Sequence, residues 1–261
     1  PKVSVPFYEK HFGMQLVHKY DFPQWNFSLY FLERPPASFK GCGEPGTPNS
    51  ESYLWNMTGQ CTLELTHNHG SEDDPDFSVW SGNSGRDLPG DSNLFIENGP
   101  VRGFGHIAFS VEDVYSFSAA LEEEGVLFQK KPDEGRMKGL AFCLDPDGYW
   151  IEVCARHRSF PGVHSNLSQT MLRVKDAEAT VDFYKNVIGM QLLLKEEFPN
   201  DFTNYFLSSA LTPDEKARWD KEQIDPSNPE ASEFANSLWY PVLEITHNHG
   251  TESDDAFRIS T

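Results

Sequence analysis

Apolar and polar residues alternate in short segments along this chain, and the segments follow a recurring order. A helix-period segment around Phe7, which Gly13 would end, is followed by alternating segments that predict strands at 14–19, 27–32 and 61–66. The pattern therefore predicts a unit in which one short amphipathic helix precedes three strands.

The same unit returns in the second half of the chain. Residues 1–16 align with residues 177–192, and both stretches end in Gly-Met-Gln-Leu. Further on, Leu-Glu-Leu-Thr-His-Asn-His-Gly at 63–70 returns as Leu-Glu-Ile-Thr-His-Asn-His-Gly at 243–250. In the second copy a further strand is predicted at 169–174, before the helix. The two stretches are copies of one structural unit.

A segment of different sequence between the copies follows the same plan. Its predicted elements are a strand at 105–111, a helix at 113–124, and strands at 126–130, 139–144 and 149–154. Each complete unit therefore consists of one strand, one helix and three further strands. This order predicts the α+β class for the whole chain.

These three modules predict two domains. The first covers residues 1–157, with module one at 1–70, which lacks its opening strand, and module two at 101–157. The second covers residues 166–261 and holds only the first module of a pair. We therefore expect the chain to be part of a longer protein with two full domains.

Several stretches lack a regular apolar pattern. Residues 34–60 and 208–240 are rich in Pro, Gly, Ser and charge and are predicted to be long surface loops. Residues 71–100 are similarly polar and are expected to wrap the surface between modules, and residues 154–168 are expected to link the domains.

Composition narrows the classes of function. The 261 residues carry 40 acidic and 21 basic side chains, a formal net charge of −19, which argues against nucleic acid or an anionic membrane as the main partner. No apolar run approaches the ~20 residues that a transmembrane helix needs. The four cysteines show no C-x-x-C pairing, so we expect reduced thiols in a cytoplasmic protein. These are Cys42, Cys61, Cys143 and Cys154.

Four polar residues stand at apolar strand positions: His106, Glu152, Gln169 and Glu244. Burying such groups costs free energy unless they are paired or ligated, so the simplest common explanation is that all four bind one divalent metal. One imidazole, two carboxylates and an amide suit zinc, nickel, cobalt, manganese or ferrous iron. With four protein ligands an octahedral ion keeps open positions, which is typical of a catalytic site.

Alternation along a strand also places possible substrate-binding groups. Arg173 shares a strand face with Gln169, Asn248 shares one with Glu244, and Arg102 lies four residues before the histidine. The pattern predicts a metal site with an adjoining polar pocket.

Six motifs, in order along nearly the whole chain, carry a family resemblance. Among them are Gln-Thr-Met-Leu-Arg-Val-Lys-Asp, Leu-Glu-Ile-Thr-His-Asn, Arg-Gly-Phe-Gly-His-Ile and Asp-Pro-Asp-Gly-Tyr-Trp-Ile-Glu. They resemble glyoxalase I, the lactoylglutathione lyase family of the vicinal-oxygen-chelate superfamily, in its tandem two-domain form. The resemblance implies βαβββ modules paired into curved mixed sheets, with an active site between modules of different domains.

The resemblance implies roles for the four polar residues. Gln169 and Glu244 match two metal ligands from one module, and His106 and Glu152 match two from its partner. Glu152 would be the catalytic base and Glu244 the carboxylate that returns the proton. Zinc is implied for members with insertions this long, and nickel for shorter ones.

The implied reaction is the isomerisation of the hemithioacetal of methylglyoxal and glutathione to S-lactoylglutathione, which detoxifies methylglyoxal. The positions matching glutathione-binding residues are Arg102, Lys130, Arg136, Met137, Arg173 and Asn248. Arg136 stands where the family often has lysine, which keeps the charge. A full tandem chain is expected to be monomeric, because two domains replace the usual dimer.

The first copy offers only Glu64 and Asn68 toward a second, incomplete site. Its glutamine-bearing strand would precede Pro1, and its partner module would follow Thr261. Two other functions within the superfamily compete with the isomerase. A non-catalytic protein that sequesters a small molecule would need neither metal nor both glutamates, and a metal oxygenase would favour two histidines and one carboxylate.

Overall fold

The computed structural model describes residues 1–35, 39–57, 61–83, 101–155, 163–209, 211–255 and 257–259, without the side chains of 101, 102, 258 and 259. The α-helices are α1 (Ser4–Phe12), α2 (Pro48–Asn56), α3 (Val114–Glu123), α4 (Ala177–Phe183), α5 (Pro213–Glu222) and α6 (Pro229–Ala235). Shorter helical turns are η1 (Pro23–Trp25), η2 (Ser71–Asp73), η3 (Tyr184–Ile188) and η4 (Thr251–Ser253). None of the helices in these ranges is both long and apolar enough to cross a membrane.

The strands follow the predicted order closely. They are β1 (Gln15–Phe22), β2 (Phe27–Glu33), β3 (Thr62–Asn68), β4 (Val101–Arg102), β5 (Phe104–Val111), β6 (Phe128–Lys130), β7 (Ala141–Leu144), β8 (Trp150–Ala155), β9 (Ser165–Val174), β10 (Gln191–Phe198), β11 (Phe202–Ser208), β12 (Val242–Asn248) and β13 (Arg258–Ile259). The first copy forms a separate three-stranded sheet in the order β1-β2-β3.

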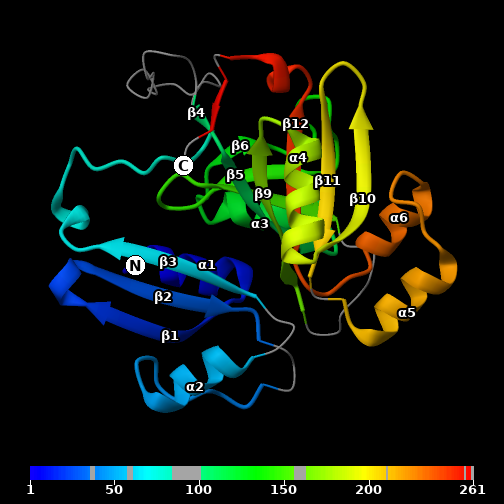
Figure 1. Cartoon of the computed structure of the whole chain (residues 1–261). Helices are drawn as coiled ribbons and strands as arrows, with labels where there is room; N and C mark the ends of the chain where they lie inside the picture. Colours follow the sequence, from blue (N-terminus) through cyan, green and yellow to red (C-terminus); the bar gives the residue numbers. More distant parts are fainter. Residues whose placement is uncertain are drawn as a thin grey trace.

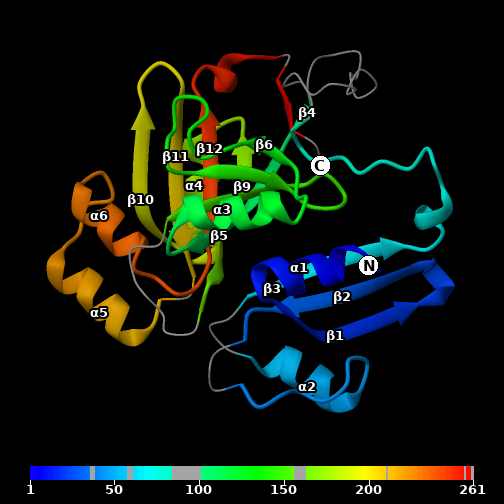
Figure 2. The same ribbon diagram turned by 180° about the vertical axis from the view of Figure 1, so that it is seen from behind.

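An eight-stranded mixed sheet joins the other two modules, in the order β10-β11-β12-β9-β5-β8-β7-β6 (Figure 1, and from behind in Figure 2). Within each module two strands run parallel, β5 with β8 and β12 with β9. The modules meet where β5 pairs antiparallel with β9. The predicted α+β fold of repeated modules in mixed sheets is therefore confirmed.

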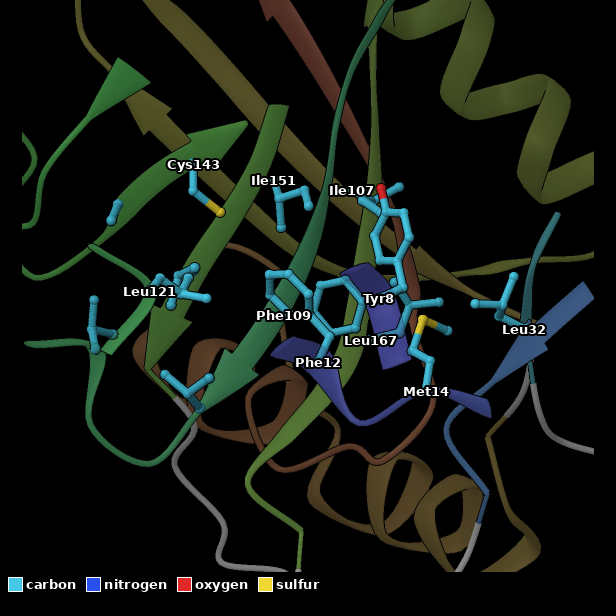
Figure 3. Packing of buried hydrophobic residues seen from close by; sticks show 14 of the residues in the cluster. Tyr8, Phe12, Met14, Leu32, Ile107, Phe109, Leu121, Cys143, Ile151 and Leu167 are labelled. Atoms are coloured by element: carbon cyan, nitrogen blue, oxygen red, sulfur yellow. The ribbon is translucent and has the colours of Figure 1, made fainter. Parts of the chain in front are cut away.

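Helix α1 anchors the first copy to the outer face of module two. Its Phe12 is fully buried, and the Phe12 and Phe109 ring centroids lie 4.3 Å apart (Figure 3). Ile107, Phe109 and Val111 of β5 all belong to this core. Because strand side chains alternate, His106 and Ala108 are left to the opposite face of the sheet.

A buried polar contact joins the same two parts of the chain. Tyr8 of α1 donates its hydroxyl hydrogen to Oδ2 of Asp145 at 2.9 Å, in the turn between β7 and β8. The backbone N–H groups of Asp147 and Tyr149 donate to Oδ1 of Asp145, both at 2.9 Å. Burial raises the pKa of Asp145, these hydrogen bonds oppose the rise, and the pKa stands at about 6.

The prediction that both insertions are surface loops is wrong, because each contains helices. The α2 helix lies against β1, and α5 and α6 lie beyond the β10 edge of the large sheet (Figure 1). Capping boxes at Thr47 and Thr212 satisfy the first backbone donors of α2 and α5. The helices also bury apolar side chains, as in the edge-to-face contact of Trp219 with Phe234 at 4.9 Å. This burial stabilises segments whose composition alone suggested loops.

The prediction of a linker over residues 154–168 is also wrong in part, because β8 continues to Ala155 and β9 begins at Ser165. Leu167 is buried against the core, and the amide nitrogen of Asn166 donates to the Trp239 carbonyl at 2.6 Å. These contacts extend the strand beyond its apolar pattern. Residues 156–162 of that linker, and 84–100 of the expected surface segment, lie outside the described residues.

Candidate metal centre

Four neighbouring strands at the middle of the large sheet carry the predicted metal ligands. His106 lies on β5, Glu152 on β8, Gln169 on β9 and Glu244 on β12. In the sheet these strands stand in the order β12-β9-β5-β8, so two ligands come from each module. The structure brings together all four residues that the sequence analysis selected.

Strand register explains why the four side chains meet. One row across the sheet runs from Glu152 through Ala108 to Gln169. The neighbouring row joins the histidine to Glu244 through Met171. Residues paired across a sheet point to the same side, so two adjacent rows present the imidazole, the amide and both carboxylates on one face.

The side chains lie within contact distance of one another. Gln169 donates from its amide nitrogen to Oε2 of Glu244 at 2.7 Å and to Oε2 of Glu152 at 3.1 Å. Nε2 of His106 lies 2.9 Å from the same oxygen of Glu152 and 3.4 Å from that of Glu244. His106, Glu152 and Glu244 are 3%, 8% and 4% exposed. These three side chains are thus almost completely buried, whereas Gln169 is half-buried.

The orientation of the imidazole fits a cation better than it fits a hydrogen bond. Nε2 of His106 is buried without an aligned hydrogen-bond partner, despite its short distances to two carboxylates. Ligand atoms of His106, Glu152 and Glu244 all lie within 4.8 Å of one another. Atoms that converge without aligning on each other can share a cation placed between them, and oxygen and imidazole donors suit a divalent metal.

The charge balance of the cluster supports this interpretation. Burial lowers the pKa of His106, but Glu152 and Glu244 raise it more, and it stands at about 9. The cluster therefore favours a positive charge beside the two glutamates. A divalent cation would supply that positive charge. The amide of Gln169, whose nitrogen faces the two glutamates, also carries an oxygen that can take the fourth ligand position.

Two neighbours of the site were missed by the sequence analysis. The Phe142 ring on β7 lies 5.3 Å from the His106 ring, edge-to-face, and shields the imidazole. Burial raises the pKa of Glu196 on β10, and the negative charges of Glu244 and Glu152 raise it further. Glu196 stands in an ordinary amphipathic strand, so the sequence gives no sign that it interacts with two of the predicted metal ligands.

The predicted substrate-binding residues occupy different settings. Asn248 is half-buried at the end of β12, and Arg173 is buried on β9. In the segment between β6 and β7, Arg136 forms an ion pair with Asp201 of the β10–β11 hairpin, and Met137 is 38% exposed.

Lys130 and Arg102 complete this predicted set. Lys130 ends β6, and its ammonium group donates to the Leu140 carbonyl at 2.6 Å. Arg102 belongs to β4, and its side chain lies outside the described part of the chain. The role of all six residues in substrate binding remains a prediction.

The first copy presents the same motif in a different environment. Glu64 is exposed, whereas its counterpart Glu244 is buried, because β3 stands at the edge of its sheet while β12 lies between β11 and β9. Glu64 and Asn68 line a cavity of about 660 Å³ together with residues of α1 and the β7–β8 turn. Within the described residues, the one group of His, Cys, Asp and Glu side chains close enough to hold a metal is the cluster of His106, Glu152 and Glu244.

Comparison with known families agrees with this geometry. A model described as "Glyoxalase/Bleomycin resistance protein/Dioxygenase superfamily" matches residues 1–153 and 166–258. The chain belongs to this superfamily. Among its curated glyoxalase relatives, the glyoxalase I of Saccharomyces cerevisiae is 38% identical, over 98% of this chain and 68% of its own length. The lactoylglutathione lyase of Schizosaccharomyces pombe is 37% identical, over 96% of this chain and 69% of its own length.

Solved glyoxalase structures show the same relationship. Glyoxalase I from Zea mays aligns with a TM-score of 0.58 and 25% identity, over 95% of this chain and 64% of the maize chain. The chain thus spans roughly two thirds of these relatives. The resemblance to tandem glyoxalase I that the motifs indicated is confirmed.

Proposed function

We propose that this glyoxalase is a lactoylglutathione lyase, which isomerises the hemithioacetal of methylglyoxal and glutathione to S-lactoylglutathione. The observation that carries the proposal is the meeting of one histidine, two glutamates and one glutamine from two modules on one face of the β12-β9-β5-β8 strands. The similarity to curated lactoylglutathione lyases supports the substrate.

The residues that would hold the metal are His106, Glu152, Gln169 and Glu244, and we propose zinc as the ion. A bound divalent metal would supply positive charge that polarises two neighbouring oxygens of the substrate. The protein contributes a rigid arrangement of donors on paired strands, and Phe142 helps to exclude water from the imidazole.

Proton transfer falls to the two carboxylates. Glu152 takes the proton from the substrate carbon that bears sulfur and hydroxyl and gives it to the oxygen of the adjacent carbon, the former ketone. Glu244 takes the hydroxyl proton of the first carbon and delivers it to the adjacent carbon, so both glutamates end as they began. The oxidation of one carbon balances the reduction of its neighbour, so no external oxidant is needed. Oε2 of both glutamates lies within 3.1 Å of the Gln169 amide nitrogen, so both groups can reach one small substrate.

Recognition of the glutathione part would use positive charge in an otherwise acidic protein. We propose Arg102, Lys130, Arg136, Met137, Arg173 and Asn248 for this role. Glutathione carries two carboxylates, and arginine binds carboxylates with paired hydrogen bonds. A formal net charge of −19 would repel such an anion unless the basic groups were gathered near the site.

The deciding experiment combines metal analysis of the purified protein with ultraviolet detection of the thioester. We expect about one zinc per chain and thioester formation from methylglyoxal and glutathione. Glu152→Gln should abolish turnover without unfolding the protein, because the amide cannot accept the substrate proton. Glu64→Gln, the matched change in the first copy, should leave turnover within about twofold.

Two results would contradict these assignments. Retained turnover in Glu152→Gln would refute the base, and a large loss in Glu64→Gln would mean that the modules pair differently. Absence of both metal and thioester would instead favour a binding protein. We also propose a cytoplasmic location, which the four free cysteines support, and a monomeric full-length tandem protein.

A further inference from the structure

We propose that Asn83 is a positioning residue for the metal ligand His106. The inference rests on the proposed metal site and assigns a role to residues 81–83, which lie outside the repeated motifs. Asn83 is 0% exposed, although its sequence neighbourhood is polar. Its amide nitrogen donates to the Gly105 carbonyl at 2.6 Å and lies 3.3 Å from the Ser81 carbonyl.

The Gly105 carbonyl belongs to an irregular point of β5. The pairing of β5 with β9 shifts register between Phe104, which faces Leu172, and His106, which faces Met171. Gly105 is therefore the extra residue of a β-bulge, and a bulge leaves a backbone group without its regular partner in the ladder. Asn83 supplies that partner in a buried place, where an unpaired carbonyl would cost about 1–3 kcal/mol.

Gly82 allows this close approach. A β-carbon there would clash with the Phe104 carbonyl, and the φ of Gly82 is +75°, a conformation that favours glycine. Gly105 in turn leaves room for the end of the Met171 side chain, whose Sδ would lie 2.6 Å from a β-carbon on Gly105. The Gly82 backbone is thus packed directly against the β5 backbone beside the bulge.

The contact acts directly on the neighbouring metal ligand. The peptide group between Gly105 and His106 is planar, so the direction of the Gly105 carbonyl fixes the direction in which the His106 backbone nitrogen and Cα lie. A bulge next to a site re-aims the following side chain. Asn83 holds that peptide plane, and through it the angle at which the imidazole enters the cluster.

The same segment contacts a predicted substrate-binding residue. Nη1 of Arg173 lies 3.5 Å from the Gly82 carbonyl and 3.4 Å from the Phe104 carbonyl, and the Arg173 backbone nitrogen donates to the Gly103 carbonyl at 2.7 Å. Arg173 therefore contacts the carbonyls of residues 103 and 104, and Asn83 contacts the carbonyl of residue 105. The segment that follows the first copy in this way supplies the supporting contact for a site built by the other two modules.

The test measures metal binding rather than turnover alone. Metal-free protein is titrated with Co²⁺ against a chromophoric chelator, and the visible absorption of bound Co²⁺ reports the ligand geometry. Asn83→Ala removes the amide, and Asn83→Asp keeps its size but replaces the donor with an acceptor. Loss of a group that orients a metal ligand typically weakens metal affinity by about 10- to 100-fold. We expect this weakening in both variants, with a changed Co²⁺ spectrum.

Asn166→Ala is the matched control. Asn166 is also buried and donates to a backbone carbonyl at 2.6 Å, but it contacts Trp239 rather than the bulge. This variant should lower the urea midpoint and leave Co²⁺ affinity within about twofold. Equal weakening in the control, or Asn83 variants that bind Co²⁺ like the wild type, would overturn the proposal.

Three outcomes can be told apart. Failure of both Asn83 variants to fold, with Asn166→Ala folded, would show that the bond serves the fold rather than the site, and would also overturn the proposal. Wild-type protein that binds no Co²⁺ would refute the metal site itself, and with it the proposed function. Wild-type binding with unaffected Asn83 variants would leave the proposed function standing and reject only the role of Asn83.

Discussion

Replacing Tyr8 by Phe should destabilise the protein in a way that depends on pH. The side chain is 1% exposed, and its hydroxyl donates to Asp145 at 2.9 Å. The substitution keeps the ring in the core and removes only this hydrogen bond between the first copy and module two. It therefore isolates one polar contact between two parts of the chain.

The sign of the pH effect follows from Asp145. Burial raises its pKa from 3.8 to about 6, so its contribution to stability is fully present below pH 3.8 and is lost as the pH rises through about 6. A shift of about 2 units corresponds to about 3 kcal/mol. The Tyr8 hydrogen bond lowers the pKa of Asp145, so Tyr8→Phe should raise it further and enlarge the loss of stability above pH 6.

The expected magnitudes differ between the two protonation states. At pH 8 Tyr8 donates to a carboxylate, and losing a hydrogen bond to a charged group costs about 1.5–3 kcal/mol. At pH 5 the acid is mostly protonated, and losing a neutral hydrogen bond costs about 0.5–1.5 kcal/mol. Urea unfolding at both pH values measures the difference.

Tyr115→Phe is the matched control, because Tyr115 donates to Asp133 at 3.0 Å but is 49% exposed. Its loss should stay within about 0.5 kcal/mol at either pH, as for most surface substitutions. The reasoning would be refuted by a loss in Tyr8→Phe that is equal at pH 5 and pH 8, or that is no larger than in Tyr115→Phe.

Three further predictions concern the core and the site. Phe12→Ala, at the fully buried contact with Phe109, should reduce the free energy of unfolding by about 3–5 kcal/mol in urea titrations, and a loss below 1 kcal/mol would mean that α1 is loosely packed. Gly105→Ala should lower the metal content of the folded protein, because the new methyl group would displace the end of the Met171 side chain, which is paired across the sheet with both His106 and Glu244, and full occupancy by elemental analysis would contradict this coupling. Removal of metal by a chelator should abolish thioester formation and lower the thermal midpoint, with Zn²⁺ restoring both, and activity that survives complete removal would exclude the proposed mechanism.

Local patterns in the sequence predicted the strands and singled out the four residues that the structure brings together at the proposed metal site. A polar residue in an apolar strand, such as Glu152 between Ile151 and Val153, is visible without any knowledge of the fold. Likewise, Gly13 after α1 and the Asp145–Gly148 turn marked element ends correctly. These signals are local, since each depends only on residues close by in the sequence.

The missed features depend on distant contacts. Thr47 and Pro48 carry a helix-start signal that composition masked, and the α2 helix also needs the surface of β1. Neither Asn83 nor Glu196 has a distinctive local pattern, because each gains its place only when strands far apart in the sequence pair. The bulge at Gly105 is equally invisible, since register is a property of two strands.

The pairing of β5 with β9 has a consequence for how this gene can vary. On β5 the residues alternate between the face of the proposed metal site and the hydrophobic core, with His106 on one side and Ile107 and Phe109 on the other. A single inserted or deleted codon inside β5 would turn the imidazole into the core and an apolar side chain toward the glutamates. Insertions and deletions can therefore accumulate in the loops. Within β5 they are excluded, because a change of register there would remove catalysis and destabilise the fold together.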